Sequence, residues 1–211
     1  MSGGVGTAEA TSKLDAFGGV RGIVAMVAIV AAMIGYRVWE RGAAADALGM
    51  VADELGLTAV RNGRHSAMNG QIDGVGVSVR TLSERSGGTD FRNYTDFVIQ
   101  APRGPSGRIV PASLRELTIG GVSGDERVVS GDAAFDESVI VSAMEAATLT
   151  ALGADGRAAV VAATDAGWEL ERYRWKARMA GHLTDAQRIE TILELGLAAE
   201  RSLREANRAG R

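Results

Sequence analysis

The feature that most constrains this chain is an uncharged apolar run near its N-terminus. Residues 22–36 read GIVAMVAIVAAMIGY, and Val38 and Trp39 continue the apolar character past Arg37. A helix rises about 1.5 Å per residue, so the run is slightly short for a hydrocarbon layer of about 30 Å, but flanking arginines can snorkel and lengthen the usable span. Aromatic residues at one end of the run match the position of an interfacial belt. The sequence therefore predicts one transmembrane helix over residues 16–41.

Two alternatives to a retained membrane span stay open for this run. Apolar runs shorter than about 18 residues are often core helices of soluble proteins. A cleaved signal peptide is the other alternative, with Lys13 and Arg21 as its basic region and the alanines at 43–45 as a cleavage site. Charges at Arg37 and Glu40 stand where a cleavage region should be neutral. We therefore expect the segment to be retained.

Small residues form one face of the predicted membrane helix. Ala25, Ala28, Ala32 and Gly35 recur at spacings of three, four and three, which places them on one side of a helix. Such a face lets a second transmembrane helix approach closely. Alanine is frequent throughout the chain, so the pattern can also follow from composition alone. With that alternative open, we single out these four as candidate helix-packing residues.

The flanking charges do not determine the orientation in the membrane. Lys13 and Arg21 precede the run, and Arg37 and Arg41 follow it, which is a tie under the positive-inside rule. Arginine greatly outnumbers lysine, a bias typical of GC-rich bacterial genomes, and the rest of the chain is rich in arginine and glutamate and poor in proline. We therefore expect a single-pass protein of the bacterial inner (cytoplasmic) membrane, with its soluble domain in the cytoplasm.

Outside the membrane segment the chain divides into three parts. Residues 1–15 are small and polar and predict a flexible tail. Residues 42–57 predict a juxtamembrane helix with a stripe that includes Leu48 and Val51 and with Gly56 at its C-terminus. Residues 58–211 mix strand and helix periods and predict a soluble domain.

The strand pattern is clearest beside Asp73-Gly74, a strong two-residue hairpin turn. Val75, Val77 and Val79 follow it and alternate with small or polar residues. Because side chains alternate across a strand, the three valines are expected to point into the core together.

Later segments predict a series of shorter elements. They are a strand at 91–100, a loop at 101–112, short strands at 117–119, 127–129 and 139–141, helices at 144–152 and 155–163, a strand at 168–179, and a final helix from a capping box at 184–187 to Asn207. Strands followed by helices, then a further strand and helix, indicate an α+β fold rather than a parallel doubly wound sheet. We expect an antiparallel sheet with helices packed against one face.

Several weak motifs occur in the same order along the chain. They are Leu-Gly-Leu at 55–57, glycines at Gly63, Gly70 and Gly74, a strand ending in Pro102, Phe135-Asp136 before a strand, and the terminal amphipathic helix. Over residues 48–205 the chain resembles membrane-associated proteins of GC-rich bacteria that have no assigned activity. The resemblance supports the expected fold and implies no reaction.

No group of residues has the spacing of a known catalytic or metal site. His65 and His182 are far apart and read as surface or loop residues, and the absence of cysteine excludes disulfides and thiolate ligands. Asp132, Asp136 and Glu137 form a small acidic group, and the two aspartates read as turn-closing residues rather than an acid and base pair. We predict no catalytic, cofactor-binding or metal-ligating residue and no cofactor.

One row of basic residues is a candidate surface for an anionic partner. If residues 168–178 form one strand, Arg172, Arg174, Lys176 and Arg178 share a face. Such a row attracts acidic headgroups or an acidic protein, although neighbouring carboxylates can also offset it. The net charge of −3 gives the whole chain no basic field, so nucleic acid is not an expected partner.

These observations favour a non-catalytic, membrane-anchored accessory or structural subunit of a larger membrane complex. Its expected partners are the lipid bilayer and other transmembrane subunits. The alternative is a membrane-tethered binding or sensing module that recruits a soluble partner or ligand. An enzyme whose site is not visible in the sequence stays open as a third reading.

Overall fold

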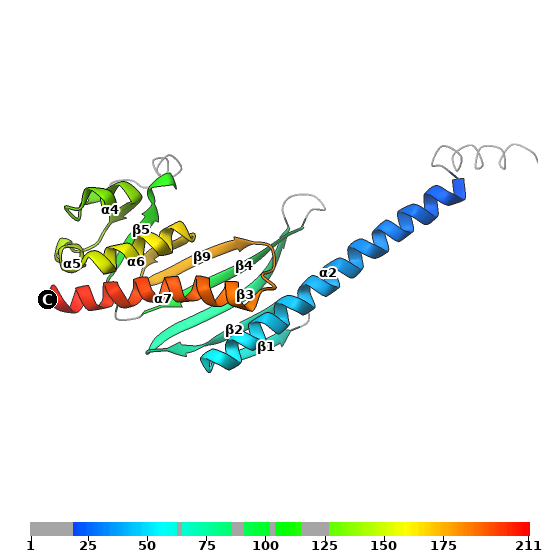
Figure 1. Cartoon of the computed structure of the whole chain (residues 1–211), viewed down its shortest axis with the longest axis horizontal. Coiled ribbons are helices and arrows are strands. Elements are labelled where there is room, and N and C mark those ends of the chain that lie inside the picture. The colour runs from blue at the N-terminus through cyan, green and yellow to red at the C-terminus, as the bar shows by residue number, and fades with distance from the viewer. Residues whose placement is uncertain (1–18, 63–64, 86–90, 102–103, 115–126) are drawn as a thin grey trace, which may run out of the picture. The chain divides into compact units, whose positions relative to one another are not determined.

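The computed structural model describes residues 19–62, 65–85, 91–101, 104–114 and 127–211 (Figure 1). The chain forms two units, Met1–Gly42 and Ala43–Arg211. The predicted tail at 1–15 and the predicted strand at 117–119 lie outside the described residues.

The fold is α+β, with a long N-terminal helix, a nine-stranded antiparallel sheet and further helices. The helices are α2 (Gly19–Leu55), η1 (Ala112–Leu114), α4 (Ala133–Ser138), α5 (Ala146–Ala151), α6 (Ala154–Asp165) and α7 (Ala186–Ala209). The strands are β1 (Thr58–Asn62), β2 (His65–Ile72), β3 (Val75–Arg85), β4 (Phe91–Gln100), β5 (Gly107–Pro111), β6 (Arg127–Val128), β7 (Val139–Ser142), β8 (Trp168–Arg172) and β9 (Arg174–Ala180).

Helix α2 runs through the predicted membrane segment and the predicted juxtamembrane helix without a break. Its side chains at 23–39 are exposed, and none of its most apolar window is buried. The core-helix alternative for this run is therefore wrong. At the other end of α2, Leu48 and Ala52 are buried in the core, and Gly56 follows the helix with φ +65°, as predicted for its C-terminus.

All strand pairs of the sheet are antiparallel, in the order β1-β2-β3-β4-β9-β8-β5-β7-β6. The predicted hairpin joins β2 to β3, and both Asp73 (φ 52°) and Gly74 (φ 75°) have the left-handed conformation that such a turn requires. Val75, Val77 and Val79 are all buried, which confirms their predicted direction.

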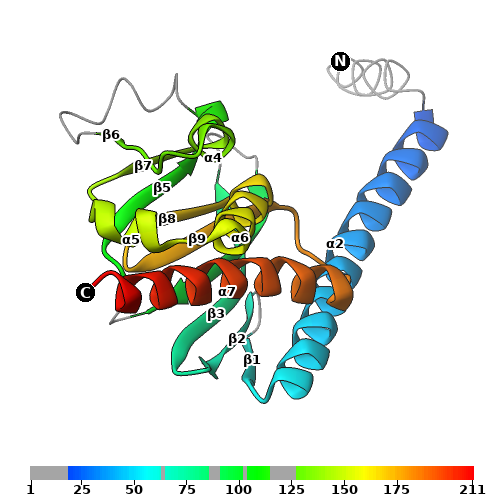
Figure 2. The ribbon, with the colours of Figure 1, turned by 60° about the vertical axis from the view of Figure 1, so that its left-hand side comes forward.

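The core lies on one face of the sheet, where the helices cover it (Figure 2). Helix α7 packs directly on β8, because the indole N–H of Trp168 donates to the carbonyl of Ile192 at 2.9 Å. Gly196 allows this close approach, since a Cβ at that position would lie 2.6 Å from the Trp168 ring. The apolar stripe of α7 is therefore fixed to the centre of the sheet.

The predicted loop at 101–112 is wrong in part, because residues 107–111 form β5 between β7 and β8. Two features explain the strand. Pro111 occupies the last position of β5, where a missing N–H is tolerated. Gly107 lies against Met144, which a side chain at 107 would displace. In the sequence, proline and glycine are typical of loops, which is why a loop was predicted here.

The predicted single strand at 168–179 is also wrong. Residues 171 and 174 pair with each other, so β8 and β9 form a hairpin with Arg172 and Tyr173 at the turn. Arg172 has φ 60°, a conformation that arginine rarely adopts. No glycine, asparagine or aspartate marks this turn in the sequence, which is why the pattern reads as one strand.

The remaining predictions are close, with three changes. Helix α4 was not predicted, and α5 is shorter than the expected 144–152. The N-cap of α7 is Asp185 rather than Thr184, because the Asp185 side chain accepts from the backbone N–H of Arg188 at 3.3 Å. The short strands near 127 and 139 are present as β6 and β7.

Candidate functional site

The exposed part of α2 is the most unusual surface in the described chain. Ile29, Met33, Val38 and Trp39 are all more than half exposed. Large apolar side chains gathered on a surface mark a contact with lipid or with protein. The helix is long and apolar enough to cross a membrane. A signal sequence near an N-terminus can have the same length and apolar character.

The four predicted helix-packing residues all lie within this exposed segment. Ala25, Ala28, Ala32 and Gly35 have exposed positions on α2, and no atom lies within 4 Å of a Cβ built at Gly35. At one end of the segment the rings of Tyr36 and Trp39 contact each other at 5.8 Å between centroids. The small face is thus open along the helix.

The predicted basic row is divided between two strands. Arg174, Lys176 and Arg178 alternate on β9 with buried Trp175 and Ala177, so these three share the sheet face opposite the core. Arg172 lies at the end of β8, beside the turn, and does not continue the row. The row therefore contains three cations in one strand and a fourth that belongs to the turn.

Carboxylates offset much of the charge of this row. Arg178 binds the two carboxylate oxygens of Asp96 at 2.8 and 3.0 Å and reaches Glu84 at 3.0 Å, which raises the pKa of Arg178 further above its ordinary value. Lys176 pairs with Glu171 at 2.6 Å, and this contact lowers the pKa of Glu171. The Lys176–Glu171 and Arg178–Glu84 pairs are exposed and contribute at most about 1 kcal/mol each. The ion pairs of Lys176 and Arg178 mainly fix the positions of these charges on the surface.

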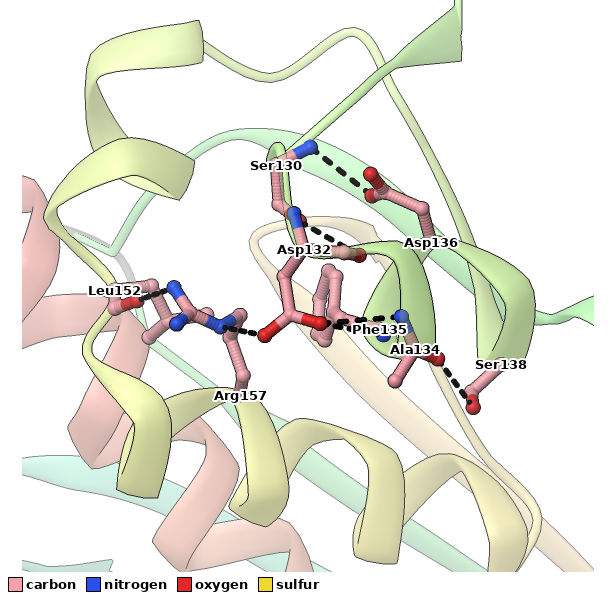
Figure 3. A network of polar contacts seen from close by, with 8 residues as sticks. All are labelled: Ser130, Asp132, Ala134, Phe135, Asp136, Ser138, Leu152 and Arg157. Atoms are coloured by element: carbon pink, nitrogen blue, oxygen red, sulfur yellow. Dashed lines mark hydrogen bonds and ion pairs between the residues drawn. The ribbon is translucent and has the colours of Figure 1, made fainter.

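The two aspartates of the acidic group near Phe135 close turns, as predicted, and Figure 3 shows their contacts. Asp132 accepts from the backbone N–H groups of Ala134 and Phe135, so it is the N-cap of α4, and Asp136 accepts from the N–H of Ser130 at 3.0 Å. Asp132 also forms an ion pair with Arg157 at 2.9 Å. The bond from the Phe135 N–H is the largest cause that lowers the pKa of Asp132. An aspartate held ionised in this way is a cap and not a proton donor.

The histidines lie in different surroundings. His65 is exposed at the start of β2, with Nδ1 3.2 Å from the carbonyl of Thr81. His182 is in a loop, as predicted, but it is buried, with Nε2 3.3 Å from the carbonyl of Leu82. Among the described residues, no three metal-ligating side chains come together.

Glu200 is a buried acidic residue that no sequence motif marks. It lies on the buried side of α7 and is only 2% exposed, and its Oε1 forms no hydrogen bond with the described residues. Burial raises its pKa to about 7, while the charge of Arg204 acts in the opposite direction. Its place in the helical period, between Gly196 and Leu203 on the apolar face, is the signal that could have identified it.

Comparisons with family models, with curated proteins and with solved structures find no match to this chain. The resemblance drawn from the weak motifs therefore stays a prediction.

Proposed function

We propose that this protein is a membrane-anchored, non-catalytic accessory subunit of a larger bacterial inner-membrane complex. The observation that supports it is the exposed apolar surface of α2 at residues 23–39. In water each fully exposed large apolar side chain forgoes about 1.5–3 kcal/mol of burial, so the segment needs lipid or protein around it. A bilayer supplies this environment along the whole segment.

The small face of α2 supports a role in assembly beyond anchoring. In lipid, helix association gains little from the hydrophobic effect and depends on close packing of backbones. Ala25, Ala28, Ala32 and Gly35 permit such an approach by a partner helix. The partner subunit then covers this face while lipid covers the larger side chains around it.

The charged sheet face gives the domain a second surface for the same complex. Arg174, Lys176 and Arg178 are exposed there, and carboxylate partners hold Lys176 and Arg178 in fixed positions. Charge patterns of this kind contribute to partner choice and association rate more than to affinity. A partner domain with a complementary acidic edge fits this surface.

The double variant Ala28→Leu, Ala32→Leu is expected to copurify with the partner at least about tenfold less. The variant protein itself should stay in the membrane. The larger side chains block backbone approach but increase the apolar character of the helix. The measurement is mild detergent extraction followed by quantitative mass spectrometry of the copurifying subunits.

The matched control replaces Val27 and Val30, on the opposite side of the helix, with leucine. This control is expected to copurify as the wild type does, because it adds bulk away from the small face. If both double variants recover their partners fully, α2 only anchors the protein and the proposed assembly role of its small face is wrong.

The side of the membrane can be read with a single thiol, because the chain contains no cysteine. Ala151 is exposed at the end of α5, so Ala151→Cys is expected to leave the fold intact. We propose a cytoplasmic domain, so an impermeant maleimide should label this variant in inverted membrane vesicles and not in intact spheroplasts. Labelling only in spheroplasts would place the domain outside the cytoplasm.

A membrane-tethered binding module is the second candidate function. It is favoured by a cavity lined with arginine at the end of α7, a feature that an accessory role does not require.

A further inference from the structure

A cavity of about 450 Å³ lies between the β2–β3 turn and the last turns of α7. Gly74 and Val75 form one wall, and Ala101 and Gly104, which follow β4, form another. These small residues leave space that larger side chains would fill. The volume falls within the range of about 300–1,000 Å³ that small-molecule sites occupy.

The third wall of the cavity is basic. Arg204 and Arg208 line it from successive turns at the end of α7, and Arg211 lines it from just beyond the helix. Arg204 donates to the backbone carbonyl of Asp73 at 3.1 Å, which holds its guanidinium group at the rim. Arg208 forms no hydrogen bond or ion pair with the described residues, so its donors are available to a ligand.

The charges around the cavity do not balance. Among the described residues that line it, three arginines and one aspartate are charged, so these side chains carry two more positive than negative charges. The carboxylate of Asp73 is already paired with Arg201 at 3.1 Å. A ligand with two negative charges would therefore balance the charges of these lining side chains.

Glu200 lies behind the same wall and carries less than one full negative charge near pH 7. A Cβ built at Gly104 would be 3.3 Å from its Oε1. Because burial raises the pKa of Glu200 to about 7, the carboxyl is partly neutral at physiological pH and does not fully cancel the arginines.

We propose that this cavity binds a small dianion, either a phosphate monoester or a short dicarboxylate, through the guanidinium groups of Arg204 and Arg208. Guanidinium forks bind carboxylate and phosphate oxygens in pairs, which favours both ligand types over a spherical anion. None of the described lining residues is aromatic, so the site offers no surface on which a base could stack. The ligand is therefore small and aliphatic or sugar-like. The inference does not depend on the role proposed for α2.

The test is isothermal titration of the full chain in nonionic detergent, at pH 7 and constant salt. The probes are glycerol 3-phosphate, succinate and acetate. We expect glycerol 3-phosphate or succinate to bind with a dissociation constant below about 1 mM, and acetate to bind at least about tenfold more weakly because it has one charge. Binding by the phosphate alone or by succinate alone identifies which dianion the site accepts, and both outcomes support the proposal.

The variant Arg208→Gln is expected to lose about tenfold in affinity, the effect of one charge-assisted hydrogen bond. Arg208 is exposed, so the variant should unfold at the wild-type temperature, which separates lost binding from lost folding. The matched control is Arg188→Gln, also exposed on α7 but in its first turn. Absence of binding by both dianions up to about 10 mM, or equal affinity in the wild type and Arg208→Gln, would overturn the proposal.

Discussion

Replacing Glu200 with glutamine is expected to remove a large part of the pH dependence of folding stability. The ordinary pKa of this carboxyl is 4.5, and burial raises it to about 7 in the folded chain. The unfolded chain then releases its proton at a lower pH than the folded chain does. Its contribution to stability is therefore full below pH 4.5, falls as pH rises through 7, and levels off above that.

The expected size follows from the shift. At about 1.4 kcal/mol per pKa unit, Glu200 lowers the free energy of unfolding by about 2–3 kcal/mol between pH 5 and pH 8. Denaturant unfolding at several pH values measures how the free energy of unfolding changes with pH. Between pH 5 and pH 8 the change in Glu200→Gln should be smaller than in the wild type by this amount.

An exposed glutamate of the same helix provides the control. Glu205→Gln makes the same chemical change on the solvent side of α7 and should keep the wild-type slope. If Glu200→Gln also keeps that slope, the carboxyl is not held in a desolvated site.

The substitution Gly196→Ala is expected to destabilise the domain by about 1–3 kcal/mol, because α7 would have to move away from the sheet. The added Cβ would lie 2.6 Å from the Trp168 ring and 2.7 Å from Ile99. The ring cannot easily yield, since its N–H is bound to the Ile192 carbonyl. Thermal unfolding of the chain in detergent measures the change.

Gly49 is a matched control for the same substitution. It also lies inside a helix, but a Cβ built there meets no atom within 4 Å. Gly49→Ala should therefore stabilise the helix by about 0.5–1 kcal/mol, the ordinary difference between glycine and alanine. Equal effects of the two substitutions would show that Gly196 has no packing role.

Local chemistry predicted most of the elements around these residues. Asp73-Gly74 specifies its turn through backbone conformation alone, and the three valines after it specify the buried face, so the hairpin could be read without tertiary information. The long apolar helix could also be predicted locally, from its uncharged run of residues. By contrast, the turn at Arg172 depends on how β5 and β9 pair with β8, and its sequence contains no turn residue.

Neither of the two features behind the binding proposal is marked by a short sequence motif. The cavity forms only when the β2–β3 turn at Asp73 meets Arg204, more than a hundred positions later in the chain. Glu200 looks like one more surface glutamate until the helical period is followed residue by residue. Sites assembled by contacts between distant segments leave no local pattern, whereas capping residues such as Asp132 do.

The central claim is that residues 22–39 hold the full chain in a bilayer, and alkaline carbonate extraction of membranes tests it most directly. Carbonate at high pH strips peripheral proteins and leaves spanning helices in place. We expect the protein in the membrane pellet, with an intact mass of 21.9 kDa by mass spectrometry. Release of the chain into the supernatant, or recovery of a shorter chain that lacks the apolar run, would contradict the claim.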